Sequence, residues 1–250
     1  MALNEDTRRP LLGVLGGMGP LATVDFLKKL IEETPAERDE DHVPAIVYSV
    51  PQIPERPAAI LDDGASPLPH MREGVRVLKR AGASVIAIAC NTAYHWYDDL
   101  QREGVPILHI ADATCDELAR MDHVRTVGLI ATKGTVAAQF FQQRLSARGV
   151  VCLLSSDEEQ DELVLPAIVA VKRHALDQAH ELAVRACERL QARGAGAIIL
   201  GCTEMPPAIE HREHPVRALC VDPTRALAKA CVRWWTNTRE LKASTQKDGR

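Results

Sequence analysis

The sequence predicts an α/β protein built as two similar halves, each with a mainly parallel sheet flanked by helices. Strands that are buried on both faces of a parallel sheet appear as short, continuous apolar runs. Val85–Ala89 and Ala197–Leu200 are runs of this kind, and a cysteine follows each of them, Cys90 or Cys202. A second observation, an internal repeat, relates the two halves.

The repeat extends well beyond the cysteines. Residues 13–30 align with residues 128–145, with glycine at the first position and leucine at the last position of both segments. The first glycine precedes Cys90 by 77 residues in one copy, and it precedes Cys202 by 74 residues in the other. Self-similarity at a fixed spacing indicates two copies of one architecture.

Length and composition agree with two globular domains. The chain has 250 residues, of which 46% are hydrophobic and 26% charged, and each half is large enough to bury its own core. We predict one domain from residues 1–113 together with 222–250, whose final helix returns to it, and a second domain from residues 114–221.

Composition also bears on partners and location. The formal net charge is −4 and there is no block of basic residues, so the charge does not indicate binding to nucleic acid or to an anionic membrane. No apolar run approaches the roughly 20 residues of a membrane span, and the first six residues do not resemble a signal peptide. The seven cysteines lack the spacing of a disulfide framework or a zinc site. We therefore expect a cytoplasmic protein with reduced thiols and no metal.

The first half begins with a strand expected at 11–15, a glycine-rich turn at 16–20 and a helix at about 21–33. Glycines allow a close approach to a ligand and a helix start offers N–H groups to an anion, although a purely structural turn fits the motif equally well. The further elements expected in this half are a strand at 44–50, a proline-stiffened loop at 51–57, a helix at 67–81, the strand before Cys90, a strand at 105–110 and a helix at about 111–120.

The second half begins with a strand expected at 124–131. Thr132 and Thr135 follow it, in the place of the glycine turn, where they can cap the next helix or bind an anion. The further elements expected here are a strand at 150–155, a helix at about 159–171, a helix at about 175–193, the strand before Cys202, a strand at 216–221 and a final helix from 222 through Trp235, with a frayed tail after about Leu241.

The two cysteines stand where open α/β sheets bind ligands, at the carboxyl ends of strands. Polar side chains follow both of them: Asn91, Thr92, Thr203 and Glu204. The other cysteines lie within predicted helices and strands, where they fit as small buried hydrophobes. Arg56, in the proline-rich loop, can clamp a carboxylate bidentately or be solvated. Lys172 suits a helix C-terminus or can point into the cleft.

Four motifs, in this order along the chain, resemble the aspartate racemase branch of the aspartate/glutamate racemase superfamily. They are Gly-Gly-Met-Gly-Pro at 16–20, Pro-Gln-Ile-Pro-Glu-Arg at 51–56, Cys-Asn-Thr-Ala at 90–93 and Gly-Cys-Thr-Glu at 201–204. The resemblance covers about residues 11–232. It implies two pseudo-symmetric Rossmann-like domains with the active site in the cleft between them, no cofactor, and usually a homodimer.

The resemblance also implies roles for single residues. Cys90 and Cys202 would be the two acid/base thiols, with Arg56 and Lys172 beside them to hold the substrate carboxylate. The other side chains implied in substrate binding are Met18, Gln52, Asn91, Thr92, Thr132, Thr135, Thr203 and Glu204. Pro57 stands where the family commonly has threonine.

The chemistry fits the residues themselves. Inversion of a stereocentre by proton transfer needs a base on one face of Cα and an acid on the other, and two halves with one thiol each supply both. A free cysteine has a pKa of about 8.5, so cations and helix N-termini must promote the thiolate. We predict interconversion of L- and D-aspartate, because Arg56 and Lys172 offer positive charge to a side-chain carboxylate. By resemblance to glutamate racemases, Cys90 would serve the D-enantiomer and Cys202 the L-enantiomer.

Other interpretations stay open. The enzyme can be a glutamate racemase or a racemase of broad specificity. It can also be a diacid isomerase or decarboxylase in which only Cys202 acts. A third class is a metabolite sensor or thiol-redox protein without catalytic activity.

Overall fold

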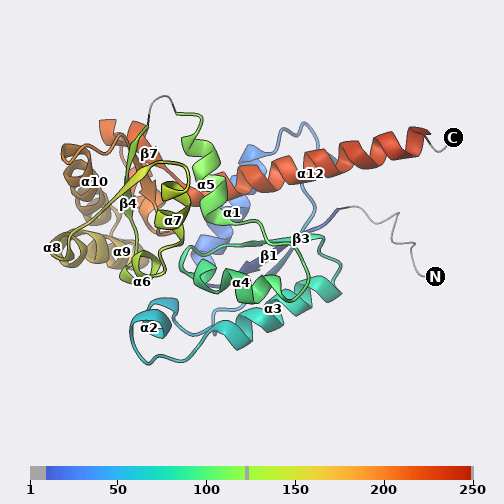
Figure 1. Ribbon diagram of the computed structural model, residues 1–250, viewed down its shortest axis with the longest axis horizontal. Coiled ribbons are helices and arrows are strands. Elements are labelled where there is room, and N and C mark those ends of the chain that lie inside the picture. Colours follow the sequence, from blue (N-terminus) through green and yellow to red (C-terminus); the bar gives the residue numbers. More distant parts are fainter. Residues whose placement is uncertain (1–9, 122–123, 249–250) are drawn as a thin grey trace.

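The computed structural model describes residues 10–121 and 124–248, so the first six residues considered above lie outside this part of the chain. It confirms the predicted fold class, with two parallel sheets flanked by helices (Figure 1). The first sheet has the strand order β2-β1-β3 and the second has the order β5-β4-β6-β7. Among the helices in the described residues, none is both long and apolar enough to cross a membrane.

The elements follow the predicted order closely. Those of the first half are β1 (Leu12–Gly16), α1 (Pro20–Glu33), β2 (Ala45–Ser49), α2 (Arg56–Leu61), α3 (Leu68–Arg80), β3 (Val85–Ile88), α4 (Tyr97–Gln101) and α5 (Ile110–Leu118). Those of the second half are β4 (Thr126–Ile130), α6 (Lys133–Ala137), α7 (Phe140–Ser146), β5 (Val151–Leu154), α8 (Asp157–Glu159), α9 (Leu165–Lys172), α10 (Leu176–Ala192), β6 (Ala197–Leu200), α11 (Met205–Glu210), β7 (Cys220–Val221) and α12 (Pro223–Asp248). Short 3-10 helices lie at Asp39–Asp41, Thr92–Trp96 and Pro215–Leu219.

The glycines that open the repeat have the same structural reason in both halves. A Cβ atom at Gly13 would lie 3.3 Å from the Cβ of Leu78 on α3, and one at Gly128 would lie 3.0 Å from the Cβ of Leu190 on α10. Both distances are tighter than ordinary side-chain contacts. In each half, therefore, a glycine in the central strand lets a helix pack directly against the sheet.

The strand register places the two thiols at equivalent positions. Gly13 pairs with Ile86 on β3, and Gly128 pairs with Ile198 on β6. Cys90 and Cys202 each stand four residues beyond these partners, after the carboxyl end of the strand. The repeat read from the sequence is thus a repeat of the sheets.

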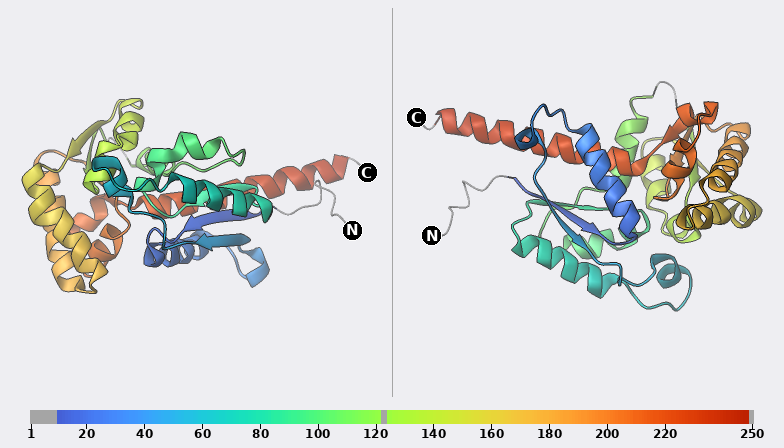
Figure 2. Two further views of the ribbon diagram at one scale, coloured as in Figure 1. Left: turned by 90° about the horizontal axis from the view of Figure 1, so that it is seen from below. Right: turned by 180° about the vertical axis from the view of Figure 1, so that it is seen from behind.

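Two helices, α5 and α12, pack on elements of the other half. β7 leads into α12, which packs on α1, and α5 packs on α7 (Figures 1 and 2). One buried apolar cluster accordingly joins Leu15 and Ile88 of the first half to Val127 and Phe141 of the second. The boundary predicted between residues 113 and 114 lies within α5, and the division into two domains stays a prediction.

Two expected strands are wrong or shortened. The apolar run at 105–110 forms only an isolated parallel bridge between Ile107 and Ile86. It ends there because α5 begins at Ile110, with His109 as its N-cap. The strand expected at 216–221 is reduced to the two residues of β7, because Pro215 opens a 3-10 helix before it.

Three helices also differ from expectation. The helix expected at 159–171 begins at Asp157 and contains a π-helical turn at Gln160–Val164, just before Pro166. Proline has no N–H to donate to the preceding turn, which explains the change of pitch. α12 continues to Asp248, so the tail predicted to fray after Leu241 is helical. The loop expected at 51–57 becomes α2 from Arg56 onward.

Candidate active site

A cavity of about 380 Å³ lies between the carboxyl edges of the two sheets and is lined from both halves. Ten of the twelve predicted site residues line it: Met18, Arg56, Cys90, Asn91, Thr92, Thr132, Lys172, Cys202, Thr203 and Glu204. Thr135 does not line the cavity but bonds to residues that do. Gln52 is exposed and does not line it.

The cavity is also lined by eight residues that were not among the twelve predicted: Gly17, Gly19, Pro20, Pro51, Ile53, Glu55, Pro57 and Ile168. Glu55 and Ile168 are the two that add to the description of the site. Glu55 lies in the same motif as Arg56, and Ile168 lies on α9 one turn before Lys172. Residues four apart on a helix share a face, so the spacing of Ile168 and Lys172 was an available signal. Glu55 adds a second carboxylate to the site, besides the predicted Glu204.

The glycine-rich turn is shaped by one residue that has to be glycine. Gly17 has a φ of +88°, and a Cβ there would lie 2.3 Å from the backbone nitrogen of Val50. Its N–H donates to the hydroxyl of Thr23 over 2.8 Å. The turn therefore lies tightly against the end of β2, and Met18, which follows it, lines the cavity.

Arg56 is fixed rather than solvated. Its Nη1 donates to the carbonyls of Ile53 and Pro54, over 3.3 and 3.1 Å, and its Nη2 donates to the carbonyl of Met18 over 3.0 Å. These bonds fasten the proline-rich loop to the glycine turn. They use three of the five N–H donors of the guanidinium, and its Nε is buried without a partner.

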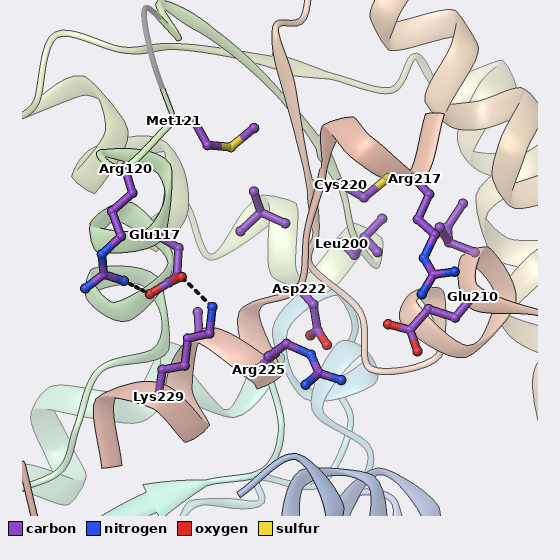
Figure 3. A pocket seen from close by; sticks show the side chains of 13 residues that line it. Glu117, Arg120, Met121, Leu200, Glu210, Arg217, Cys220, Asp222, Arg225 and Lys229 are labelled. Atoms are coloured by element: carbon purple, nitrogen blue, oxygen red, sulfur yellow. Dashed lines mark hydrogen bonds and ion pairs between the residues drawn. The ribbon is translucent and has the colours of Figure 1, made fainter. Parts of the chain in front are cut away.

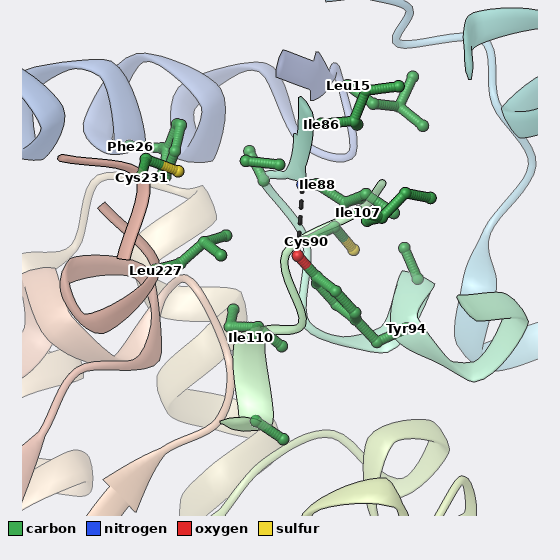
Figure 4. Packing of buried hydrophobic residues seen from close by; sticks show 14 of the residues in the cluster. Leu15, Phe26, Ile86, Ile88, Cys90, Tyr94, Ile107, Ile110, Leu227 and Cys231 are labelled. Atoms are coloured by element: carbon green, nitrogen blue, oxygen red, sulfur yellow. Dashed lines mark hydrogen bonds between the residues drawn. The ribbon is translucent and has the colours of Figure 1, made fainter. Parts of the chain in front are cut away.

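The edge that carries Cys90 ends in an amide without partners. Cys90 is 5% exposed and Asn91 is 3% exposed. Neither the nitrogen nor the oxygen of the Asn91 amide has a hydrogen-bond partner. Such groups are rare in folded proteins and call for a bound molecule or another explanation. Tyr94 supports this edge, since its hydroxyl accepts from the N–H of Ile88 over 3.3 Å (Figure 4).

Threonine hydroxyls connect the two halves beside the cavity. The hydroxyls of Thr92 and Thr135 lie 2.8 Å apart. Thr132 is the N-cap of α6, and its hydroxyl accepts from the N–H of Thr135 over 3.2 Å. Gly134 permits this close contact, because a Cβ there would lie 2.9 Å from the Cα of Pro57 on α2. The capping role considered for Thr132 is thus present.

The edge that carries Cys202 holds a carboxylate instead. The Cys202 thiol donates to Oε2 of Glu204 over 2.9 Å, and the hydroxyl of Thr203 donates to the same oxygen over 3.0 Å. Lys172 places its Nζ 3.9 Å from the other oxygen, Oε1. Burial first, and then the negative charge of Glu204, raise the pKa of the Cys202 thiol well above its usual range, while Lys172 acts in the opposite direction. Cys202 therefore rests as a thiol.

A second cavity, of about 340 Å³, lies beside the end of α5 and the start of α12. Figure 3 shows Glu117 there, bonded to Arg120 and Lys229. Arg225, which also lines it, pairs with Glu32 and Glu33 on α1. Because these cations already have partners, this cavity is a less suitable candidate than the one between the thiols.

The fold and the site together define a class of protein, namely two-sheet α/β proteins with one thiol at the end of a strand in each half and one cavity between the thiols. A cavity of this size suits a small molecule.

Comparison with known proteins identifies the family. The sequence model of the Asp/Glu/Hydantoin racemase family matches residues 15–231. A broad-specificity amino-acid racemase, RacX, of Bacillus subtilis is 26% identical over 229 residues, which are 89% of this chain and 96% of that protein. The aspartate racemase of Picrophilus torridus has a similar structure, with a TM-score of 0.78 and 28% identity over 91% of this chain and 94% of that one. An aspartate racemase homologue from Pyrococcus horikoshii has a TM-score of 0.73 and 27% identity over 90% and 98% of the two chains.

The chain belongs to the Asp/Glu/hydantoin racemase family. It is an amino-acid racemase, an isomerase, and its structural neighbours agree with the aspartate racemase branch that the motifs indicated.

Proposed function

We propose that this racemase inverts a small amino acid without a cofactor, by moving a proton at Cα between Cys90 and Cys202 in the cleft between the halves. One observation carries this proposal: two thiols at equivalent strand ends line the same cavity. A base and an acid on opposite faces of Cα are what inversion requires.

In the proposed mechanism, the thiolate of one cysteine removes the Cα proton, and the electron pair passes into the substrate carboxylate as an enolate-like intermediate. The thiol of the other cysteine then gives its proton to the opposite face. Lys172 and the remaining N–H groups of Arg56 would stabilise the charge that develops on the carboxylate. Asn91, whose amide lacks partners, would bind the amino-acid head group.

Aspartate is the substrate we propose first. Arg56 and Lys172 supply positive charge, and the Picrophilus torridus neighbour is an aspartate racemase. We also expect a homodimer from the resemblance to the family, which size-exclusion chromatography with light scattering would test.

Broad specificity is the second candidate, and a specific feature of the site favours it. Three N–H groups of Arg56 already donate to backbone carbonyls, and Lys172 pairs with Glu204. Glu55 adds another carboxylate to the lining. The lining thus holds two cations and two carboxylates, which suits neutral side chains as well as acidic ones.

A hydrogen-exchange assay in D2O tests the function. The purified chain, without added cofactor, is incubated with L-aspartate, L-glutamate or a neutral amino acid, and deuteration at Cα and the enantiomer ratio are followed. Deuteration with loss of optical purity on aspartate alone supports the first candidate, and similar rates on neutral amino acids support the second. If no amino acid exchanges its Cα proton, the two-thiol mechanism is wrong, and turnover of maleate would then favour the one-cysteine alternative.

A further inference from the structure

The two thiols stand at equivalent positions but touch different groups. Cys202 donates to a carboxylate over 2.9 Å. For Cys90, the structure shows no hydrogen bond to the thiol within residues 10–121 and 124–248. Proton transfer on the Cys202 side therefore has a local acceptor that the Cys90 side lacks.

We propose that Glu204 is the proton acceptor for Cys202, so that the two residues act as a thiol–carboxylate pair in racemisation, whereas Cys90 exchanges its proton directly with solvent. This inference rests on the proposed function. It assigns to Glu204 a catalytic role at the reacting sulfur rather than the substrate-binding role that the resemblance implies.

The contacts of Glu204 fit an acceptor better than a substrate ligand. Its Oε2 already accepts from both Cys202 and Thr203. Its side chain is 19% exposed, and Oε1 lies toward Lys172, which lines the same cavity. Oε2 therefore contacts the thiol directly, and the carboxyl group as a whole stays partly exposed, so that a proton it accepts can leave to solvent.

Each proton in the proposed cycle has a donor and an acceptor. When the substrate presents its Cα–H to Cys202, the thiol proton moves from Sγ to Oε2, leaving a thiolate and a neutral carboxylic acid. The thiolate forms an S–H bond with the Cα proton, the C–H electron pair enters the substrate carboxylate, and the thiol of Cys90 gives its proton to the opposite face. Glu204 then releases its proton to solvent as Cys90 regains one. In the reverse direction, Glu204 returns its proton to Cys202 as the thiol proton passes to Cα.

The competing interpretation is that Glu204 acts on Cys202 only through a fixed negative charge. As a carboxylate that never takes a proton, Glu204 would only keep Cys202 protonated, and removing the charge would make the thiolate easier to form. The two roles predict opposite effects of Glu204→Gln. Loss of an acceptor slows proton removal by Cys202, and loss of a fixed charge speeds it.

The test measures exchange of each enantiomer separately. The purified full chain, its Glu204→Gln variant and its Glu204→Asp variant are incubated in D2O with pure L- or D-aspartate, or with the best amino acid of the substrate panel, at pD values from about 6 to 9. Deuterium at Cα of the recovered starting enantiomer is measured by mass spectrometry at low conversion. Thermal unfolding of each variant verifies that it is folded.

We expect Glu204→Gln to lower the exchange of one enantiomer, relative to the other, by about tenfold or more near neutral pD, as for loss of a general base. The remaining exchange of that enantiomer should rise about tenfold per pD unit, because the thiol must now lose its proton to solvent. For that same enantiomer, the unmodified protein should show a flat profile in this range. Glu204→Asp keeps a carboxylate and should restore the flat profile. Glu55→Gln, which changes a lining carboxylate that bonds to neither thiol, should leave the ratio of the two exchange rates as it is.

Two results overturn the inference while leaving the proposed function standing. Faster exchange in Glu204→Gln identifies a fixed charge, and an equal fall for both enantiomers identifies a role in binding substrate. Absence of Cα exchange in the unmodified protein instead overturns the proposed function and the inference together.

Discussion

The two halves of the molecule follow one backbone plan but make different polar contacts. The order of the first three strands, the pairing of the opening glycine and the place of the cysteine are the same in both, and the second sheet adds a fourth strand, β7. The groups beside the thiols differ, with an amide free of partners after Cys90 and a bonded carboxylate after Cys202. The repeat thus keeps the geometry that places two thiols at one cavity, whereas the side chains around the two thiols differ.

The helices that pass between the halves show the same divergence. Asp222 caps α12, since its Oδ1 accepts from the N–H of Thr224 over 2.8 Å, and His109 caps α5 by accepting from Ala111 over 3.1 Å. Lys29, which is 2% exposed, pairs with Asp222 over 2.6 Å. Its counterpart in the repeat, Arg144, pairs with Asp112 instead. The start of α12 is thus held by the buried ion pair of Asp222 with Lys29, whereas the start of α5 is capped by the neutral imidazole of His109.

Substitution of either thiol should have the largest effect. Cys90→Ala and Cys202→Ala should each lower racemisation by about a thousandfold or more, because each removes a group that must act as both acid and base. The enantiomers have equal free energies, so kcat/KM must fall equally in both directions for any variant, and racemisation rates alone cannot distinguish the halves.

One-sided exchange in D2O can distinguish them. The Cys90→Ala variant should still deuterate the enantiomer whose Cα–H faces Cys202, and the Cys202→Ala variant should deuterate only the other. The double variant serves as the control and should deuterate neither. Full racemisation by either single variant would show that two thiols are not needed.

The ion pair at α12 should give the next largest effect, this time on stability. Lys29→Met leaves Asp222 buried without its cation, and breaking a buried pair costs about 3–5 kcal/mol of unfolding free energy. Chemical denaturation at neutral pH measures this loss. Lys29→Met combined with Asp222→Asn should recover much of it, and Arg144→Met, at a pair that is more exposed, should cost clearly less. Equal losses from the two single variants would contradict the asymmetry.

Alkaline pH tests the same pair. Burial alone would lower the pKa of Lys29, but the carboxylates of Asp222 and Asp25 outweigh it and raise this pKa above its ordinary value of 10.5. The stabilisation is therefore complete below that value and is lost as pH rises through the folded pKa. The Lys29→Met variant should lack this alkaline loss.

At the start of α5, His109 should instead make the protein less stable at acid pH. Burial, and then the charge of Arg144, lower the pKa of His109 from 6.5 to about 3. Between these values the unfolded chain binds a proton that the folded chain does not, so stability falls as the pH falls. From pH 7 to pH 5 this amounts to about 2 kcal/mol. His109→Asn keeps a capping oxygen and should flatten this acid dependence, as measured by urea unfolding at the two pH values, even though loss of the ring lowers stability at both.

The sequence predicted those features that depend on local pattern or on the repeat. Apolar runs marked the central strands, and strand ends marked the thiols, because both follow from burial and sheet geometry. The run at 105–110 was misread because apolar content alone cannot show that His109 starts a helix. The bond from Arg56, at the start of α2, to the carbonyl of Met18 joins residues 38 positions apart, which no local pattern contains. The contact between Cys202 and Glu204 has a spacing of two residues and so was within reach of sequence reasoning.

The residues that directly follow the two cysteines should show the smallest effect. The Asn91 amide has no protein partner, whereas the Thr203 hydroxyl is engaged with Glu204. Asn91→Ala should therefore raise KM about tenfold, the value of one hydrogen bond to a charged group. It should not lower the melting temperature, because the variant removes a buried polar group that nothing satisfied. Thr203→Ala should change KM less, since its hydroxyl is not free for substrate.

Tyr94→Phe is the matched control for Asn91→Ala. The Tyr94 hydroxyl donates to the carbonyl of Leu108 over 3.0 Å and accepts from the N–H of Ile88, so its loss leaves one buried and one partly buried backbone group without a partner. This variant should lose about 1–3 kcal/mol of stability with little change in KM. Steady-state kinetics and thermal unfolding of the three variants measure both quantities. If Asn91→Ala instead destabilises the fold and spares KM, then Asn91 supports the strand end as Tyr94 does, and the two edges differ less in their contact with substrate than their hydrogen bonds indicate.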